Sequence, residues 1–129
     1  MTKQSSQPLR FNYEFSRVYK RGKPLSGRYI VVHFFRRPKG ICHNTTPIPP
    51  DINRVGFTGN RRIKGAVRRN RAKRLLRESY RLLKDGLPGG YDFIVMMRYA
   101  DPLPSFIDTY EDMRRLFGQL VRSGSKTND

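Results

Sequence analysis

The segment from Arg61 to Lys84, RRIKGAVRRNRAKRLLRESYRLLK, constrains the fold of this chain more than any other. Eleven of its 24 residues are Lys or Arg, and Glu78 is its one acidic residue. Apolar and small residues recur at helical spacing and predict a helix from Ala66 to about Lys84 with one buried face. The members of that face are Ala72, Leu75, Leu76, Ser79 and Leu83. The fold must therefore bury one side of this helix and leave a face of a single charge sign outside.

The opposite face of this helix is cationic throughout, with Lys73, Arg74, Arg77, Arg81 and Lys84 beside Asn70. A solvated helix surface usually mixes charges in i,i+4 pairs, whereas like charges are neighbours here. Further cations crowd the start of the helix, where the macrodipole makes each one cost roughly 0.3–1 kcal/mol at low salt; they are Arg61, Arg62, Lys64, Arg68 and Arg69. The alternative, a purely solvated face, leaves this repulsion uncompensated. Backbone N–H groups at a helix start also bind phosphate, so we predict a polyphosphate partner.

The overall charge agrees with such a partner, and the composition argues against a membrane protein and a secreted protein. The chain has 129 residues, 27 of them basic and 10 acidic, for a net charge of +17. Its longest apolar run, 93–97, is far short of the roughly 18–20 residues that span a bilayer. The N-terminal residues lack the apolar block of a secretory signal. The one cysteine, Cys42, excludes an internal disulfide and fits a reducing compartment. We expect a cytoplasmic protein that binds a polyanion and no membrane.

Periodicity and turn residues predict the elements outside this segment. We expect a helix at 9–20, strands at 28–35, 54–58 and 91–98, and a last helix from Pro102 or Pro104 to about Val121. The unbroken apolar run of the last strand indicates burial on both faces. The connection at 37–53 is longer than a usual hairpin; we expect a surface loop, with a functional lid as the alternative.

These elements predict a single domain at 9–121, with a flexible basic arm at 1–8 and a flexible tail at 122–129. Helices segregated onto a small sheet are typical of the α+β class. By the general handedness rule, the strand–helix–strand unit from Arg54 to Arg98 would cross over right-handed.

RNA fits the chain better than DNA. The basic helix lies between strands, without the helix–turn–helix pair or heptad zipper of common DNA-binding proteins. RNA is often recognised through its backbone and through unstacked bases on aromatic rings. Aromatic residues precede the basic helix, and we expect most of them in the core and a few in a stacking surface: Phe11, Phe15, Tyr19, Tyr29, His33 and Phe35.

A protein enzyme is the main alternative class, but the sequence shows no recognisable set of catalytic or metal-binding residues. Cys42 and His43 lack the spacing of a four-ligand zinc site, and the acidic residues form no catalytic motif. Asp92, beside a strand start, is a candidate partner for a basic side chain.

Within residues 54–80, RVGFTGNRRIKGAVRRNRAKRLLRESY, the spacing of Arg69-Asn70-Arg71, Lys73-Arg74 and Arg77 resembles the bacterial ribonuclease P protein component. Residues 15–22 resemble the first helix of that family, and residues 91–98 resemble its last strand. The resemblance covers roughly residues 9–121. A ribosomal or general RNA-binding protein remains the alternative, which only the spacing from Arg69 to Arg77 disfavours.

The resemblance implies an α-β sandwich with an about four-stranded sheet, three helices and a left-handed crossover, against the general rule. It implies the protein subunit of an endoribonuclease that removes the 5′ leader of precursor tRNA. Catalysis would reside in the RNA subunit, which would mainly hold the Mg²⁺ ions, so the protein would contribute no catalytic residue. The implied partners are this catalytic RNA and precursor tRNA, and no protein partner would be required.

The resemblance also assigns residues by position. Arg69, Asn70, Arg71, Lys73, Arg74 and Arg77 would face RNA, and Arg61 and Arg62 match a basic pair before the helix. The charge pattern adds Arg68 and Arg81 to this predicted RNA-binding set. Phe15, Tyr19 and His33 match aromatic positions of a cleft for the single-stranded leader, and His33 stands where a tyrosine is common. Lys64-Gly65 departs from the glycine-first turn that is usual in the family, and Gly59 stands in place of a strand residue.

Overall fold

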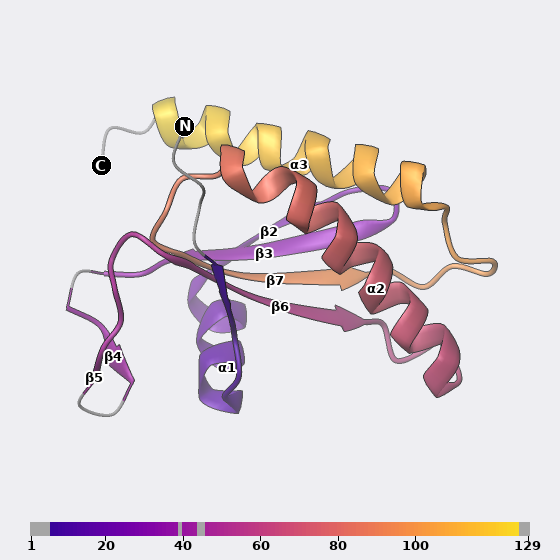
Figure 1. Ribbon diagram of the computed structural model, residues 1–129, viewed down its shortest axis with the longest axis horizontal. Helices are drawn as coiled ribbons and strands as arrows, with labels where there is room; N and C mark the ends of the chain where they lie inside the picture. The colour runs from indigo at the N-terminus through magenta and orange to yellow at the C-terminus, as the bar shows by residue number, and fades with distance from the viewer. Residues whose placement is uncertain (1–5, 39, 44–45, 127–129) are drawn as a thin grey trace.

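The computed structural model describes residues 6–38, 40–43 and 46–126, which form a sheet with helices on both faces (Figure 1). The helices of this part of the chain are α1 (Asn12–Arg21), α2 (Ala66–Leu83) and α3 (Phe106–Lys126), with a short 3-10 turn, η1 (Lys84–Gly86), after α2. The main sheet has the order β1 (Ser6–Pro8), β6 (Asn53–Gly59), β7 (Tyr91–Met97), β3 (Ile30–Arg36) and β2 (Lys23–Ser26). The α+β prediction is confirmed.

The crossover from β6 through α2 to β7 is left-handed. The two strands are parallel neighbours, with Arg54 opposite Asp92 in register. In Figure 1 both strands point to the right, α2 lies in front of the sheet, and β7 lies above β6. The expectation from the family resemblance is thus confirmed, and the expectation from the general rule is wrong for this unit.

The sheet has more strands than predicted. β1 lies within the predicted flexible arm and pairs in parallel with the start of β6, whereas residues 1–5 lie outside the described residues. β2 pairs with β3 at the other edge, where Pro24 is tolerated because an edge strand can leave an N–H position empty. The predicted loop at 37–53 contains a small hairpin of β4 (Cys42–His43) and β5 (Thr46–Pro47).

Two helix ends also differ from the prediction. α1 begins later than expected because the Leu9 N–H donates to the Val55 carbonyl, 2.9 Å away, and continues the pairing of β1. The Glu14 carboxylate then accepts the Phe11 N–H at 3.3 Å and closes the first turn of α1. α3 continues through Lys126 instead of ending near Val121, since no proline follows to stop it. Residues 122–126 of the predicted tail are therefore helical, and 127–129 lie outside the described residues.

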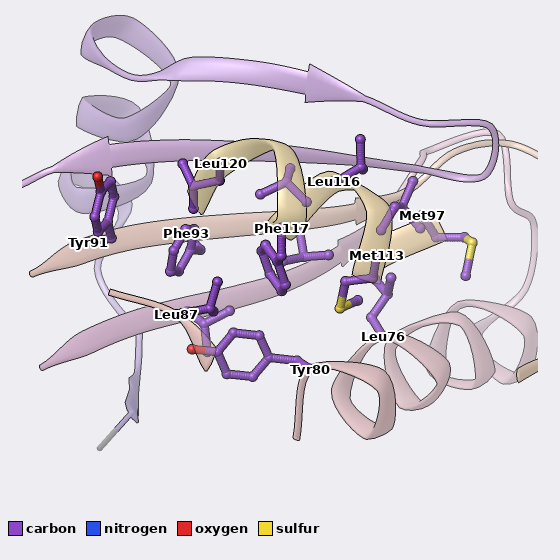
Figure 2. Close-up of a cluster of buried hydrophobic side chains, with 14 of the residues drawn as sticks. Leu76, Tyr80, Leu87, Tyr91, Phe93, Met97, Met113, Leu116, Phe117 and Leu120 are labelled. Carbon is purple, nitrogen blue, oxygen red and sulfur yellow. The ribbon is translucent and has the colours of Figure 1, made fainter. Parts of the chain in front are cut away.

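The main core lies between the sheet and the pair α2 and α3 (Figure 2). Leu76 and Tyr80 of α2 pack there with Phe93 of β7 and with Met113 and Phe117 of α3. A second, smaller cluster lies under α1 on the other face of the sheet; its buried members are Leu9, Val18, Phe35 and Ile94. The predicted burial of both faces of the last strand is confirmed, and the sheet separates two surfaces on which functional side chains can lie.

Candidate nucleic-acid interface

The start of α2 is a cationic surface without a capping side chain. Gly65 precedes the helix with φ of 89°, a conformation that a side chain rarely adopts. The first turn holds no acidic residue, so its N–H groups without a partner in the helix lie among cations. Arg61, Arg62 and Arg69 are exposed there, as the sequence predicts.

One of these cations has an acidic partner that the sequence does not predict. The guanidinium of Arg68 binds the carboxylate of Asp101, in the segment between β7 and α3. Both side chains are about half exposed, so this ion pair neutralises little of the surface. Arg62, at the turn before α2, lies over the ring of Tyr99, with 4.9 Å from the guanidinium carbon to the ring centroid. The segment after β7 therefore borders the cationic surface.

The predicted RNA-binding residues of α2 divide into two rows. Arg69, Lys73 and Arg77 follow each other at i,i+4 spacing on the side near β6. Arg69 Nη1 lies 3.5 Å from the Ile63 carbonyl, and the Arg77 guanidinium lies 5.9 Å from the centre of the Phe57 ring. We call these three residues the inner row.

The second row faces the start of α3. Asn70, Arg71 and Arg74 line a hollow there together with Phe106. We call these three polar residues the outer row. Arg81 lies two turns beyond Arg74 and donates to the Glu78 carboxylate at 3.1 Å. It is the member of the predicted RNA-binding set whose acidic partner lies on α2 itself. The helix thus offers cations on two sides rather than along a single arc.

The predicted aromatic site lies on the other face of the sheet, where α1 packs. Tyr19 and His33 are in edge contact, with ring centroids 4.9 Å apart. Phe15, one turn earlier on α1, lies over Gly56 of β6, where a Cβ atom would come within 2.6 Å of the Phe15 ring. Tyr19 is 47% exposed and Phe15 is partly buried. The three side chains therefore share one face of the sheet, and Tyr19 offers the most ring surface to a ligand.

Burial tunes the ionisable groups of this aromatic site. Desolvation lowers the pKa of His33 and raises the pKa of Tyr19, so both side chains favour their neutral forms. The His33 Nδ1 atom is buried and has no hydrogen-bond partner among the described residues. A neutral imidazole next to a tyrosine is suited to stacking and to hydrogen bonding with a base or a sugar hydroxyl.

A buried ion network lies at the base of α1. Asp92 is fully buried and accepts hydrogen bonds from Arg54 and from Arg37, whose Nη1 lies 2.7 Å from Oδ1. Arg17 of α1 reaches the same carboxylate at 3.4 Å, and Arg54 also binds the buried Glu14. Burial by itself lowers the pKa of Arg54, but the hydrogen bonds and charges of Asp92 and Glu14 outweigh burial and raise it.

The same network holds the long loop. Arg37 donates to the carbonyls of Pro49 at 3.1 Å, Ile52 at 2.6 Å and Tyr91 at 2.8 Å. The two ends of the loop at 37–53 are thus tied to each other and to β7. Of this network, the sequence predicts only Asp92 as a partner for a basic side chain.

Neither a metal site nor a membrane span emerges from the described residues. Among residues 6–38, 40–43 and 46–126, no three His, Cys, Asp or Glu side chains are grouped so as to hold a metal ion. The helices in these ranges are too polar or too short to cross a bilayer.

Comparisons with known proteins agree with this geometry. The sequence model of the family described as Ribonuclease P matches residues 4–121. The Ribonuclease P protein component of Natranaerobius thermophilus is 40% identical over 115 residues, which are 88% of this chain and 86% of that protein. That of Pelotomaculum thermopropionicum is 44% identical over 90 residues, 70% of each chain. The solved structure of the RNase P protein from Thermotoga maritima has a TM-score of 0.69 and 30% identity, and the match covers 88% of this chain and 96% of that one.

Proposed function

Since this chain belongs to the ribonuclease P protein family, we propose that its two faces hold the two RNAs of that enzyme. The chain acts as the protein subunit of a ribonucleoprotein endoribonuclease that matures the 5′ ends of tRNA, and its partner is the RNA subunit. Family membership therefore decides against a ribosomal or general RNA-binding role. The finer division of contacts between the two faces is our proposal.

In this proposal, the cationic rows of α2 bind the phosphates of the catalytic RNA. The single observation that carries the proposal is the pair of rows itself: six polar side chains, five of them cationic, on two sides of one helix. Arginine and lysine side chains release counterions when they neutralise phosphates, which supplies affinity in a salt-dependent way. The planar guanidinium group also suits two-point contacts with phosphate oxygens. Neutralising the RNA in this way lowers the concentration of Mg²⁺ that the complex needs.

The aromatic site at Phe15, Tyr19 and His33 would hold the single-stranded 5′ leader of precursor tRNA. Bases of a single strand stack on aromatic rings with little dependence on sequence. Tyr19 has the exposed ring, and the partly exposed ring of His33 lies in edge contact with it. Mature tRNA lacks the leader, so this site would favour the precursor over the product.

The chemical step would belong to the RNA subunit, which would mainly hold the Mg²⁺ ions of the reaction. Glu14 of α1 and Asp92 of β7 are buried carboxylates, and arginines bind both of them. Within the described residues they do not form a metal site. The protein would position RNA and neutralise charge without a catalytic residue of its own. We also propose a cytoplasmic location and no need for a protein partner.

Reconstitution tests this function. The purified chain is mixed with a bacterial ribonuclease P RNA and precursor tRNA at low magnesium, and the 5′ cleavage products are separated on a gel. We expect the chain to stimulate release of the leader and to leave a 5′-phosphate on the tRNA. RNA binding without stimulated cleavage would contradict the assignment to this reaction.

A further inference from the structure

A groove runs along α2 on the side that faces the start of α3. We call it the α2–α3 groove; its lining residues are Val67, Asn70, Arg71, Arg74, Leu75, Glu78 and Phe106. Its volume of about 740 Å³ lies within the roughly 300–1,000 Å³ typical of pockets for small ligands. The groove is separate from the aromatic site, because α2 and α1 pack on opposite faces of the sheet.

The floor of this groove is apolar and open to solvent. Val67 is 83% exposed and Phe106 is 39% exposed. The Phe106 ring is stacked on Tyr110, with centroids 6.1 Å apart, which restrains its position. Leu75 completes the floor and packs inward against the core. An exposed apolar patch inside a strongly basic surface marks a contact site rather than ordinary solvated helix.

The rim of the groove carries groups that can bind a nucleotide. Within the described part of the chain, the side chains of Asn70, Arg71 and Arg74 make no hydrogen bond or ion pair with another residue. Glu78, at the far end, is held by Arg81 at 3.1 Å. The two guanidinium groups suit phosphate oxygens, whereas an amide and a carboxylate can bind the polar edge of a base.

We propose that the α2–α3 groove binds one unstacked nucleotide of the partner RNA. Its base lies against Val67, Leu75 and Phe106, and its flanking phosphates lie on Arg71 and Arg74. Charge complementarity selects RNA over a second copy of this chain, because two copies with +17 each would bring like-charged rims together. The inference rests on the proposed function, since it names where the RNA subunit places a splayed base.

A tryptophan reporter tests the contact directly. The chain has no tryptophan, so Phe106→Trp or Val67→Trp places a single emitter in the groove. A bacterial ribonuclease P RNA is added until binding saturates, and we expect strong quenching of this emission by a stacked base. Leu82→Trp, on an exposed position of α2 outside the groove, is the matched control and should change little.

Affinity provides an independent measurement. Val67→Ala and Phe106→Ala should each weaken binding of that RNA by about 5-fold to 100-fold, the loss of one base contact. The slope of affinity against salt should stay unchanged, because no phosphate contact is removed. Leu82→Ala should bind as tightly as the unaltered chain. Thermal unfolding of each variant shows whether its fold is intact. Val67 is more exposed than Phe106, so Val67→Ala should disturb the fold less than Phe106→Ala.

The outcomes separate this inference from the proposed function. RNA that binds and is cleaved while the groove reporters stay unquenched overturns the inference alone. Failure of the chain to stimulate cleavage overturns the proposed function, whatever the reporters show. Reporter emission that changes with protein concentration in the absence of RNA shows a second copy in the groove and also overturns the inference.

Discussion

The guanidinium of Arg54 binds both carboxylate oxygens of Asp92, with Nε 3.0 Å from Oδ1 and Nη2 2.8 Å from Oδ2. The two residues lie opposite each other on the parallel strands β6 and β7. Their contact is buried beneath α1, the helix that carries Phe15 and Tyr19. The ion network therefore sets the position of the aromatic site from below.

Asp92→Asn should destabilise the fold by about 3–5 kcal/mol, because it leaves buried arginines without their shared counter-charge. The measurement is the free energy of unfolding in urea. Asp101→Asn is the matched control, since Asp101 pairs with Arg68 at the surface, and it should cost at most about 1 kcal/mol. Equal losses of unfolding free energy in the two variants would show that the buried network stabilises the fold no more than a surface ion pair does.

Gly56→Ala should also destabilise the fold, since the new Cβ atom would come within 2.6 Å of the Phe15 ring. Overpacking of this kind costs about 1–3 kcal/mol, and here it also pushes Phe15 away from the sheet. Thermal unfolding and affinity for precursor tRNA are the two measurements. Gly59→Ala serves as the control, because its Cβ atom would meet Ile63 at an ordinary 3.5 Å.

Tyr19→Ala should weaken binding of precursor tRNA by about 1–3 kcal/mol, the value of one lost base stack. Binding of mature tRNA should not change, because the leader is absent. Equilibrium titrations of the RNA complex with both ligands measure the difference. Tyr13→Ala removes an equally exposed ring from another side of α1, and an equal loss there would remove the reason to place the leader at Tyr19. Phe15→Ala is a poorer test, since Phe15 also packs against the smaller core.

His33 should make stability depend on pH. Burial lowers its pKa from the ordinary value of 6.5, so just below that pH the unfolded chain binds more protons than the folded one. The contribution of His33 to stability is thus present above 6.5 and is lost as the pH falls through the folded-state pKa. Urea unfolding at about pH 7.5 and about pH 5.5 should show this loss.

His33→Gln should remove that part of the pH dependence and leave the rest. The chain has two histidines, so a His43→Gln variant lets NMR follow the imidazole of His33 by itself. A midpoint at or above 6.5 in the folded protein would contradict the lowered pKa.

Arg69→Ala and Arg71→Ala should each weaken binding of the RNA subunit and reduce its salt slope by about 0.7–0.9 per lost phosphate contact. The two residues lie in the inner and the outer row, so together they test both sides of α2. Affinities measured over a series of salt concentrations give the slopes. Arg114→Ala, an exposed arginine of α3 paired with Glu111, is the control and should leave the slope unchanged.

Local periodicity in the sequence predicts which residues form a helix and which side of that helix is buried. Leu76 and Arg77 show why: neighbours on α2 fall on a buried and an exposed side because of helical spacing alone. The family resemblance added the handedness of the crossover, which local patterns do not contain.

The features that the sequence did not predict depend on long-range contacts. Arg54 and Asp92 are 38 residues apart, and only the pairing of β6 with β7 makes them neighbours. β1 and β2 were missed because short, polar or proline-containing segments carry no strand pattern, although a sheet edge accepts them. The α2–α3 groove was missed for a related reason, since Phe106 reaches Val67 only through the packing of two helices.

The arginine that closes the long loop has a practical consequence for labelling. Arg37 ties Pro49 and Ile52 to β7. The β4–β5 hairpin, which lies between Arg37 and Pro49 in the chain, is therefore anchored at both of its ends. The sole thiol of the chain, Cys42, is exposed on that hairpin, and Figure 1 places the hairpin at the opposite end of the molecule from the start of α2. A donor dye on Cys42 and an acceptor dye on the RNA would therefore report the orientation of the protein on that RNA by energy transfer. No cysteine has to be introduced or removed for this labelling.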